Sequence, residues 1–129
     1  MSEPERKNTP RAGAGGRGVH DVGGLEFGPV DRSEHDLALW EKRTDAMLIL
    51  LRDNKRRVLS VDAHRRMIET YAEQEYDRTT YYEKWIRSVR NLLVEQNVLT
   101  RAEIEARMAE VRAKHEKAGR KAVKETVPW

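Results

Sequence analysis

The 129-residue sequence contains no cysteine, which excludes disulfides, thiolate-bound metals and cysteine nucleophiles together. Long apolar runs are also missing. No stretch approaches the roughly 18 consecutive apolar residues of a membrane span, and the N-terminus has no apolar signal-peptide core. The sequence therefore predicts a soluble, cytoplasmic protein that does not associate with membranes.

Net charge is small, because 25 lysines and arginines face 22 acidic residues, which leaves +3. So small an excess does not favour a dedicated nucleic-acid surface. Hydrophobic residues make up 38% of the chain and charged residues 36%, which is lean for a self-sufficient core, so a protein partner is expected. The alternative is a helical adaptor or nucleic-acid-binding protein that uses the arginine-dense stretch 52–66 as a basic patch.

Glycine and proline are absent between positions 30 and 116, whereas seven of the eight glycines and three of the four prolines lie within residues 4–29. The change near residue 30 therefore separates a glycine- and proline-rich N-terminal segment from the rest of the chain. Residues 1–17 have the low hydrophobicity of a disordered tail, whereas residues 18–32 carry apolar anchors and are expected to form an extended arm. A helical domain over 33–118 and a C-terminal tail over 119–129 complete the predicted organisation.

The remaining pattern is helical, and we predict an all-α fold of about four helices with no strand and no repeat. Capping signals mark most of the starts: Ser33 before Asp36, Ser60 or Asp62, and the capping-box threonines Thr80 and Thr100. The first and third helices are expected to be strongly amphipathic, and the stripe of the fourth is thin. The first helix is expected to end near 54 and the third near 97.

Aromatic residues gather in one short stretch, which holds all four tyrosines, 71, 76, 81 and 82, followed by Trp85. Tyr81 and Trp85 stand at i and i+4 and therefore share one helix face. Two interpretations stay open. The aromatics are either core residues whose hydroxyls reach surface partners, or the wall of a pocket or interface.

Basic residues offer a second candidate site. Arg65 and Arg66 follow His64 in the short second helix, and one of such a pair is expected to point inward or sideways. An inward guanidinium needs a planar or forked oxyanion, and no acidic cluster in the sequence supplies one. Histidines 20, 35, 64 and 115 show no ligand spacing, so this chain is not expected to bind a metal.

The order of several motifs carries a resemblance. "HDVGG", "FGPV", "LWEKR", "VDAHRRMIETY", "YYEKW" and "LLVEQNVLT" resemble, in order and spacing, the N-terminal helical half of the nitrile hydratase beta subunit over residues 18 to about 112. The family continues into a C-terminal barrel, which is expected on another polypeptide here. The resemblance thus points to three-chain enzymes of the toyocamycin nitrile hydratase or thiocyanate hydrolase type. "RTTYY" departs from the family, in which many members have a proline before the tyrosines.

The resemblance implies the beta-type subunit of a heteromeric enzyme that hydrates a nitrile to an amide, with the beta subunit of thiocyanate hydrolase as the alternative. The alpha-type partner would hold cobalt(III), or as second choice iron(III), between oxidised cysteines, and a third subunit would carry the barrel. No cofactor would be bound by this chain. The helices would pack on the partner subunits.

Site residues follow from the same resemblance. The family arginine that hydrogen-bonds the oxidised cysteines lies sixteen residues before the first tyrosine of "YYEKW", which places it at Arg65. Tyr81 and Trp85 would line the substrate pocket, with Tyr76 in support. The arm would clasp the alpha-type subunit. Its candidate partner-binding residues are His20, Asp21, Val22, Leu25 and Phe27.

Overall fold

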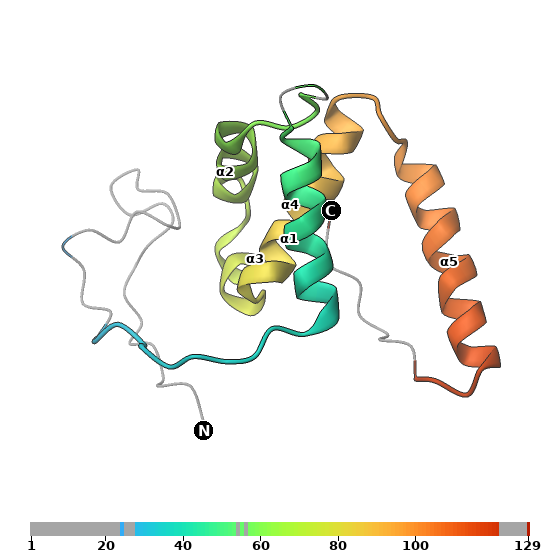
Figure 1. Cartoon of the computed structure of the whole chain (residues 1–129), viewed down its shortest axis with the longest axis horizontal. Helices are drawn as coiled ribbons and strands as arrows, with labels where there is room; N and C mark the ends of the chain where they lie inside the picture. The colour runs from blue at the N-terminus through green and yellow to red at the C-terminus, as the bar shows by residue number, and fades with distance from the viewer. Residues whose placement is uncertain (1–23, 25–27, 54, 56, 122–128) are drawn as a thin grey trace.

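The computed structural model describes Gly24 and residues 28–53, 55, 57–121 and 129. Within this part the chain forms α1 (Leu39–Leu51), α2 (Val61–Glu69), α3 (Glu73–Arg78), α4 (Tyr81–Glu95) and α5 (Arg101–Lys117), and no strand. The predicted all-α fold is confirmed. Figure 1 shows α1 to α4 gathered in one bundle, with α5 standing apart from it.

The core lies where α1 and α2 pack against α4. Four apolar side chains are almost fully buried there: Leu48 (1% exposed), Leu59 (4%), Val89 (1%) and Leu92 (0%). Partly buried residues, among them Met67 and Trp85, pack around them. The core is small, as the lean composition predicts.

The first helix begins at Leu39, not at Ser33 as predicted. The Ser33 N–H instead donates to the Asp31 carboxylate at 2.9 Å, which closes a local turn and lowers the pKa of Asp31. Residues 31–38 have no helical structure. The Glu41 carboxylate accepts the Ala38 N–H at 2.7 Å and fixes the true start.

The prediction that the first helix is strongly amphipathic was wrong. Leu48 of α1 is buried, but Leu39, Ile49 and Leu50 of the same helix are 63%, 56% and 57% exposed. Apolar residues therefore occupy more than one side of α1. Only one of those sides is covered by α4 in the described part of the chain.

The two predicted capping boxes are confirmed. Thr80 and Glu83 exchange their hydrogen bonds at the start of α4, at 2.8 and 3.4 Å. Thr100 and Glu103 do the same at the start of α5, at 2.7 and 3.2 Å. Between the two helices Asn97 adopts a left-handed backbone (φ 58°), which ends α4 and turns the chain into α5.

Helix α3 was not predicted. It is six residues long, has no side-chain hydrogen bond at its N-cap and buries none of its residues. It ends where the Thr79 hydroxyl donates to the Glu75 carbonyl at 2.8 Å. Its segment has no apolar stripe, so tertiary contacts of Glu75, described below, hold it in place.

Candidate functional site

Three aromatic side chains of α4 form a contiguous cluster. The ring of Tyr81 lies 4.8 Å from that of Trp85 and 5.3 Å from that of Tyr82. Tyr82 and Trp85 are 5.4 Å apart, so all three rings touch. Tyr81 is 61% exposed and forms the outer edge of the cluster. Tyr81 therefore forms the exposed part of this aromatic wall, whereas Trp85, its i, i+4 neighbour, is partly buried against the core.

Two further rings join the cluster from other helices, and the sequence did not single them out. Trp40 of α1 meets Tyr82 edge-on at 6.4 Å, and His64 of α2 meets Trp85 edge-on at 5.1 Å. Such geometry is favourable between aromatic rings. Contacts between helices distant in sequence leave no spacing signal, so local patterns did not reveal them.

The tyrosines divide between the two interpretations that the sequence left open. Tyr71 is a core residue, 3% exposed, and its hydroxyl donates to the Lys84 carbonyl at 2.9 Å. Its burial raises the pKa of its phenol. Tyr81 belongs to the exposed wall. Tyr76 stands under the Lys84 ammonium at 4.5 Å, and no ring contact joins it to Tyr81 or Trp85 in the described residues.

The two arginines of α2 are both exposed, so neither points inward, the first of the two directions expected for one of them. Arg66 forms an ion pair with Glu95 at 2.7 Å, which the sequence did not reveal because 29 residues separate them. No hydrogen bond or ion pair reaches the Arg65 side chain from the part of the chain that the structure describes. Arg65 is therefore exposed and unpaired among the described residues, one position after His64, whose ring touches Trp85.

His64 is the buried polar residue nearest this site. It is 6% exposed, and neither ring nitrogen has a hydrogen-bond partner among the described residues. A neutral imidazole still carries one N–H, whose unpaired burial costs about 1–3 kcal/mol. Burial, reinforced by the positive charge of Arg52, lowers the pKa of His64, so the ring is uncharged at neutral pH.

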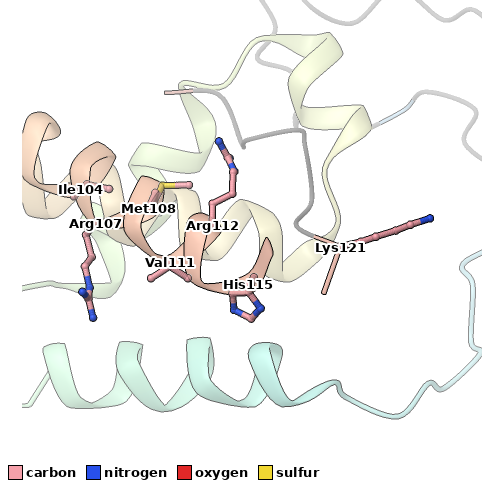
Figure 2. A pocket seen from close by; sticks show the side chains of 7 residues that line it. All are labelled: Ile104, Arg107, Met108, Val111, Arg112, His115 and Lys121. Carbon is pink, nitrogen blue, oxygen red and sulfur yellow. The ribbon is translucent and has the colours of Figure 1, made fainter. Parts of the chain in front are cut away.

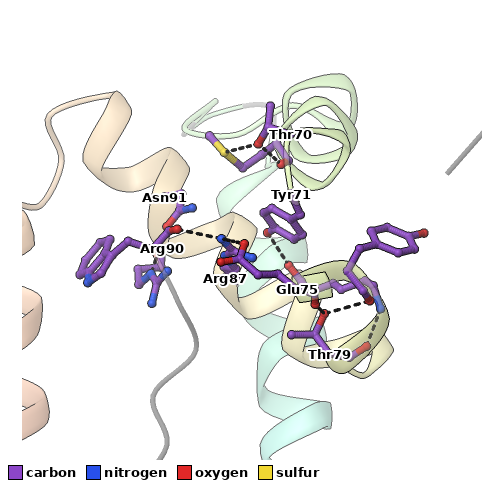
Figure 3. Close-up of polar contacts among 11 residues, drawn as sticks. Thr70, Tyr71, Glu75, Thr79, Arg87, Arg90 and Asn91 are labelled. Atoms are coloured by element: carbon purple, nitrogen blue, oxygen red, sulfur yellow. Dashed lines mark hydrogen bonds and ion pairs between the residues drawn. The ribbon is translucent and has the colours of Figure 1, made fainter. Parts of the chain in front are cut away.

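The buried arginine is Arg87 of α4, which the sequence did not indicate (Figure 3). It is 4% exposed and donates to the Glu75 carboxylate at 2.8 Å and to the Trp129 main-chain oxygen at 2.7 Å. Its guanidinium also lies 4.0 Å from the centre of the Tyr71 ring. Arg87 therefore joins α3, α4 and the far end of the sequence.

Trp129 is held between two more arginines. Arg90 of α4 and Arg101 of α5 lie 4.0 and 4.5 Å from the centre of its ring. Burial, with Arg87 and Arg101 nearby, lowers the pKa of Arg90 to about 10. The tryptophan separates like charges and links the start of α5 to α4.

A pocket of about 520 Å³ lies along α5 (Figure 2). Neither Arg65 nor the cluster contributes to its lining. The residues that line the pocket are Ile104, Arg107, Met108, Val111, Arg112, His115 and Lys121.

Some predicted residues cannot be placed. The arm residues lie outside the described part of the chain, and their role stays a prediction: His20, Asp21, Val22, Leu25 and Phe27. Among the described residues, no group of three or more histidines, aspartates and glutamates gathers as a metal site. No helix in the same part has the length and apolar character needed to cross a membrane.

Known proteins resemble this chain over most of its length. Two curated nitrile hydratase beta subunits match: that of Pseudomonas putida is 37% identical over 67% of this chain, and that of Pseudomonas chlororaphis is 31% identical over 68%. This chain spans only 41% and 43% of those proteins. Among solved structures, recombinant apo thiocyanate hydrolase from Thiobacillus thioparus matches with a TM-score of 0.70 and 26% identity, over 87% of this chain and 70% of the matched chain.

The family model named "Nitrile hydratase beta subunit, N-terminal" matches residues 17–127. The match covers the described helices and the whole of the predicted arm. It agrees with the resemblance found in the sequence motifs, and the solved relative shares the helical fold. The chain therefore belongs to the nitrile hydratase beta subunit family, in the N-terminal region of that subunit.

Proposed function

We propose that this chain is the beta-type subunit of a heteromeric, cytoplasmic nitrile hydratase-like hydro-lyase. It would cover a metal site held by an alpha-type partner, while a separate subunit supplies the barrel. Family membership supports this proposal. The lean core and the exposed apolar side of α1 favour a protein partner as well.

The observation that carries the proposal is an exposed Arg65, unpaired among the described residues, on the helix that packs against the one bearing Tyr81 and Trp85. Arg65 lies on α2, which packs on α4, the helix of Tyr81 and Trp85. The preceding residue, His64, touches Trp85. An exposed cation without a counter-ion among the described residues, together with the exposed ring of Tyr81, suits a subunit that closes over a partner's polar site.

Arg65 suits oxidised cysteines chemically. Its planar fork can donate two parallel hydrogen bonds to the oxygens of a sulfinate or sulfenate, which a lysine ammonium cannot reproduce. This chain offers no ligand group among its described residues, so the metal would be the partner's cobalt(III), or iron(III) as second choice. Bound in the partner, that ion would supply Lewis acidity toward the nitrile. The role of Arg65 would be to hold the sulfur oxygens in place.

The wall favours a neutral organic nitrile as substrate. Tyr81, Tyr82 and Trp85 offer ring faces and phenol hydroxyls without a formal charge. Tyr81 and Trp85 would line the substrate side, with Tyr76 in support. Thiocyanate is the second candidate, favoured by the solved relative, which is a thiocyanate hydrolase, and by the positive charge of Arg65.

The first test is to co-express this chain with its candidate partner subunits and purify the complex through a tag on this chain. We expect one cobalt per alpha-type subunit and conversion of a nitrile to its amide. Thiocyanate is assayed in parallel, and its turnover in place of nitriles would select the alternative. Purification of this chain alone, metal-free and inactive with both substrates, would contradict the proposal and favour an adaptor.

A second test uses neighbouring arginines. Arg65→Lys should lower turnover or metal content roughly 10- to 100-fold, because the two-pronged contact with the sulfur oxygens is lost. Arg66→Lys is the matched control. This variant keeps the positive charge at position 66 and alters only the exposed ion pair with Glu95, so turnover should stay within about twofold. Full turnover and metal content in Arg65→Lys would show that Arg65 is misassigned.

A further inference from the structure

His64 joins α2 to α4 through both its side chain and its main chain. The imidazole meets the Trp85 ring edge-on, with centroids 5.1 Å apart and planes at 86°. The His64 carbonyl accepts a hydrogen bond from the hydroxyl of Ser88, at 3.1 Å, and Ser88 is 0% exposed. Trp85 and Ser88 are one turn apart on α4. The two contacts therefore fix both the distance and the rotation of α2 against α4.

This joint lies between the two residues that matter most for the proposed function. Arg65 follows His64 directly in the chain, and Trp85 is the ring that His64 touches. The ion pair between Arg66 and Glu95, which also joins these helices, is exposed and contributes little rigidity. His64 is thus the contact that sets Arg65 relative to the aromatic wall.

The joint depends on an uncharged ring. His64 is 6% exposed, and both ring nitrogens lack partners among the described residues, so an added proton would be buried without a counter-ion. The charged group that acts on the imidazole from the end of α1 is Arg52, also a cation. Helix α4 presents the uncharged Trp85 and Ser88, and α2 itself adds two arginines.

We propose that His64 is a positioning residue of the proposed hydration site. Its uncharged ring and its carbonyl hold Arg65 and Trp85 in one fixed relation, and a proton on the ring releases it. The proposal rests on the proposed function and assigns that site a dependence on pH within this subunit. A phenylalanine would fill the same slot without any titration, which makes His64→Phe the informative variant.

The activity test compares pH profiles of the assembled enzyme, normalised to metal content. From about pH 7.5 to about pH 5, we expect the turnover of the wild type, divided by that of His64→Phe, to fall at least about threefold. His35→Gln, which removes an exposed histidine, is the matched control and should leave the wild-type profile intact. A ratio that stays constant across this range would overturn the proposal, because a purely structural residue alters yield and not the pH profile.

A second measurement needs no activity and no His64 variant. The chain is labelled with 5-fluorotryptophan and assembled with unlabelled partners, and the Trp85 fluorine resonance is assigned with Trp85→Phe. We expect this resonance to shift with a midpoint below the ordinary histidine value of 6.5. A resonance that does not move as the pH falls would refute the proposed pH-dependent contact between His64 and Trp85.

The two measurements separate the inference from the function it rests on. If the complex hydrates neither nitriles nor thiocyanate, but the Trp85 resonance titrates, the joint stands and the proposed function fails. If the complex is active but neither the turnover ratio nor the resonance responds to pH, the function stands and the role of His64 is refuted.

Discussion

At the scale of single residues, His64 and Arg87 accommodate a buried polar group in opposite ways. His64 stays uncharged and leaves its ring nitrogens without partners in the described residues. Arg87 stays charged and donates from one guanidinium nitrogen to a carboxylate and a main-chain oxygen, while its Nε and Nη1 have no partner among the described residues. The contribution of His64 to stability should therefore depend on pH, whereas that of Arg87 should depend on its partner Glu75.

Glu75→Gln should lower the free energy of unfolding by about 2 kcal/mol, because it leaves the Arg87 charge buried without its counter-ion. The estimate is below that for a fully buried pair since the Glu75 side chain is 33% exposed. Urea denaturation at neutral pH measures it. Glu95→Gln, which breaks the exposed pair with Arg66, should cost less than about 0.5 kcal/mol. Equal losses in the two variants would refute a special role for the Arg87 pair.

Acid should destabilise the chain through His64. Its pKa is lowered in the folded state, so the unfolded chain takes up the proton more readily. The stabilisation is complete above the unfolded value of 6.5 and is lost as the pH falls from there toward the folded value. Denaturant titrations should show a loss of up to about 1.4 kcal/mol per pH unit in this window. His64→Phe should lack this contribution, and an unchanged slope would argue against it.

At the scale of elements, the caps of α4 and α5 are alike but should have different consequences. Thr80→Ala weakens the helix at the centre of the core, so global stability should fall by about 1 kcal/mol. Thr100→Ala should instead increase hydrogen exchange within α5, with little change in the global unfolding transition, because α5 does not pack extensively on the bundle. Equal shifts of the thermal midpoint would show that α5 belongs to the cooperative core.

Local signals predicted the elements whose causes are local. The box of Thr80 and Glu83 marked the start of α4 because both partners lie within one turn. The start of α1 was missed because Asp31 takes the N–H of the expected cap, Ser33. Helix α3 was missed because its support, the pair of Glu75 with Arg87, is tertiary.

The candidate site, like the helices, was predictable only where its signals are local in the sequence. The i, i+4 spacing of Tyr81 and Trp85 predicted that they share one helix face, and the order of the motifs indicated Arg65 as the candidate arginine. Neither spacing nor composition revealed His64 and Trp40 as neighbours of the wall, because those contacts join separate helices. The outward direction of Arg66 was equally hidden, since its partner lies 29 residues away.

At the scale of the whole molecule, a small core coexists with uncovered apolar surface on α1. The isolated chain should therefore bind the dye ANS, and assembly with its partners should suppress that signal. Leu50→Gln, at a side chain that is 57% exposed, should lower ANS binding of the isolated chain without a large loss of stability. Strong ANS fluorescence that persists in the complex would mean that this side of α1 is not an interface.

Helix α5 carries its own start signal at Thr100 and its own stop at Gly119, whose backbone is left-handed (φ 70°). A helix specified this way does not depend on the α1 to α4 core for its boundaries. Over evolutionary time its outer face can change with the surface it meets, while the core is selected for stability alone. Within one small subunit, two rates of sequence divergence should therefore coexist, separated at the turn around Asn97.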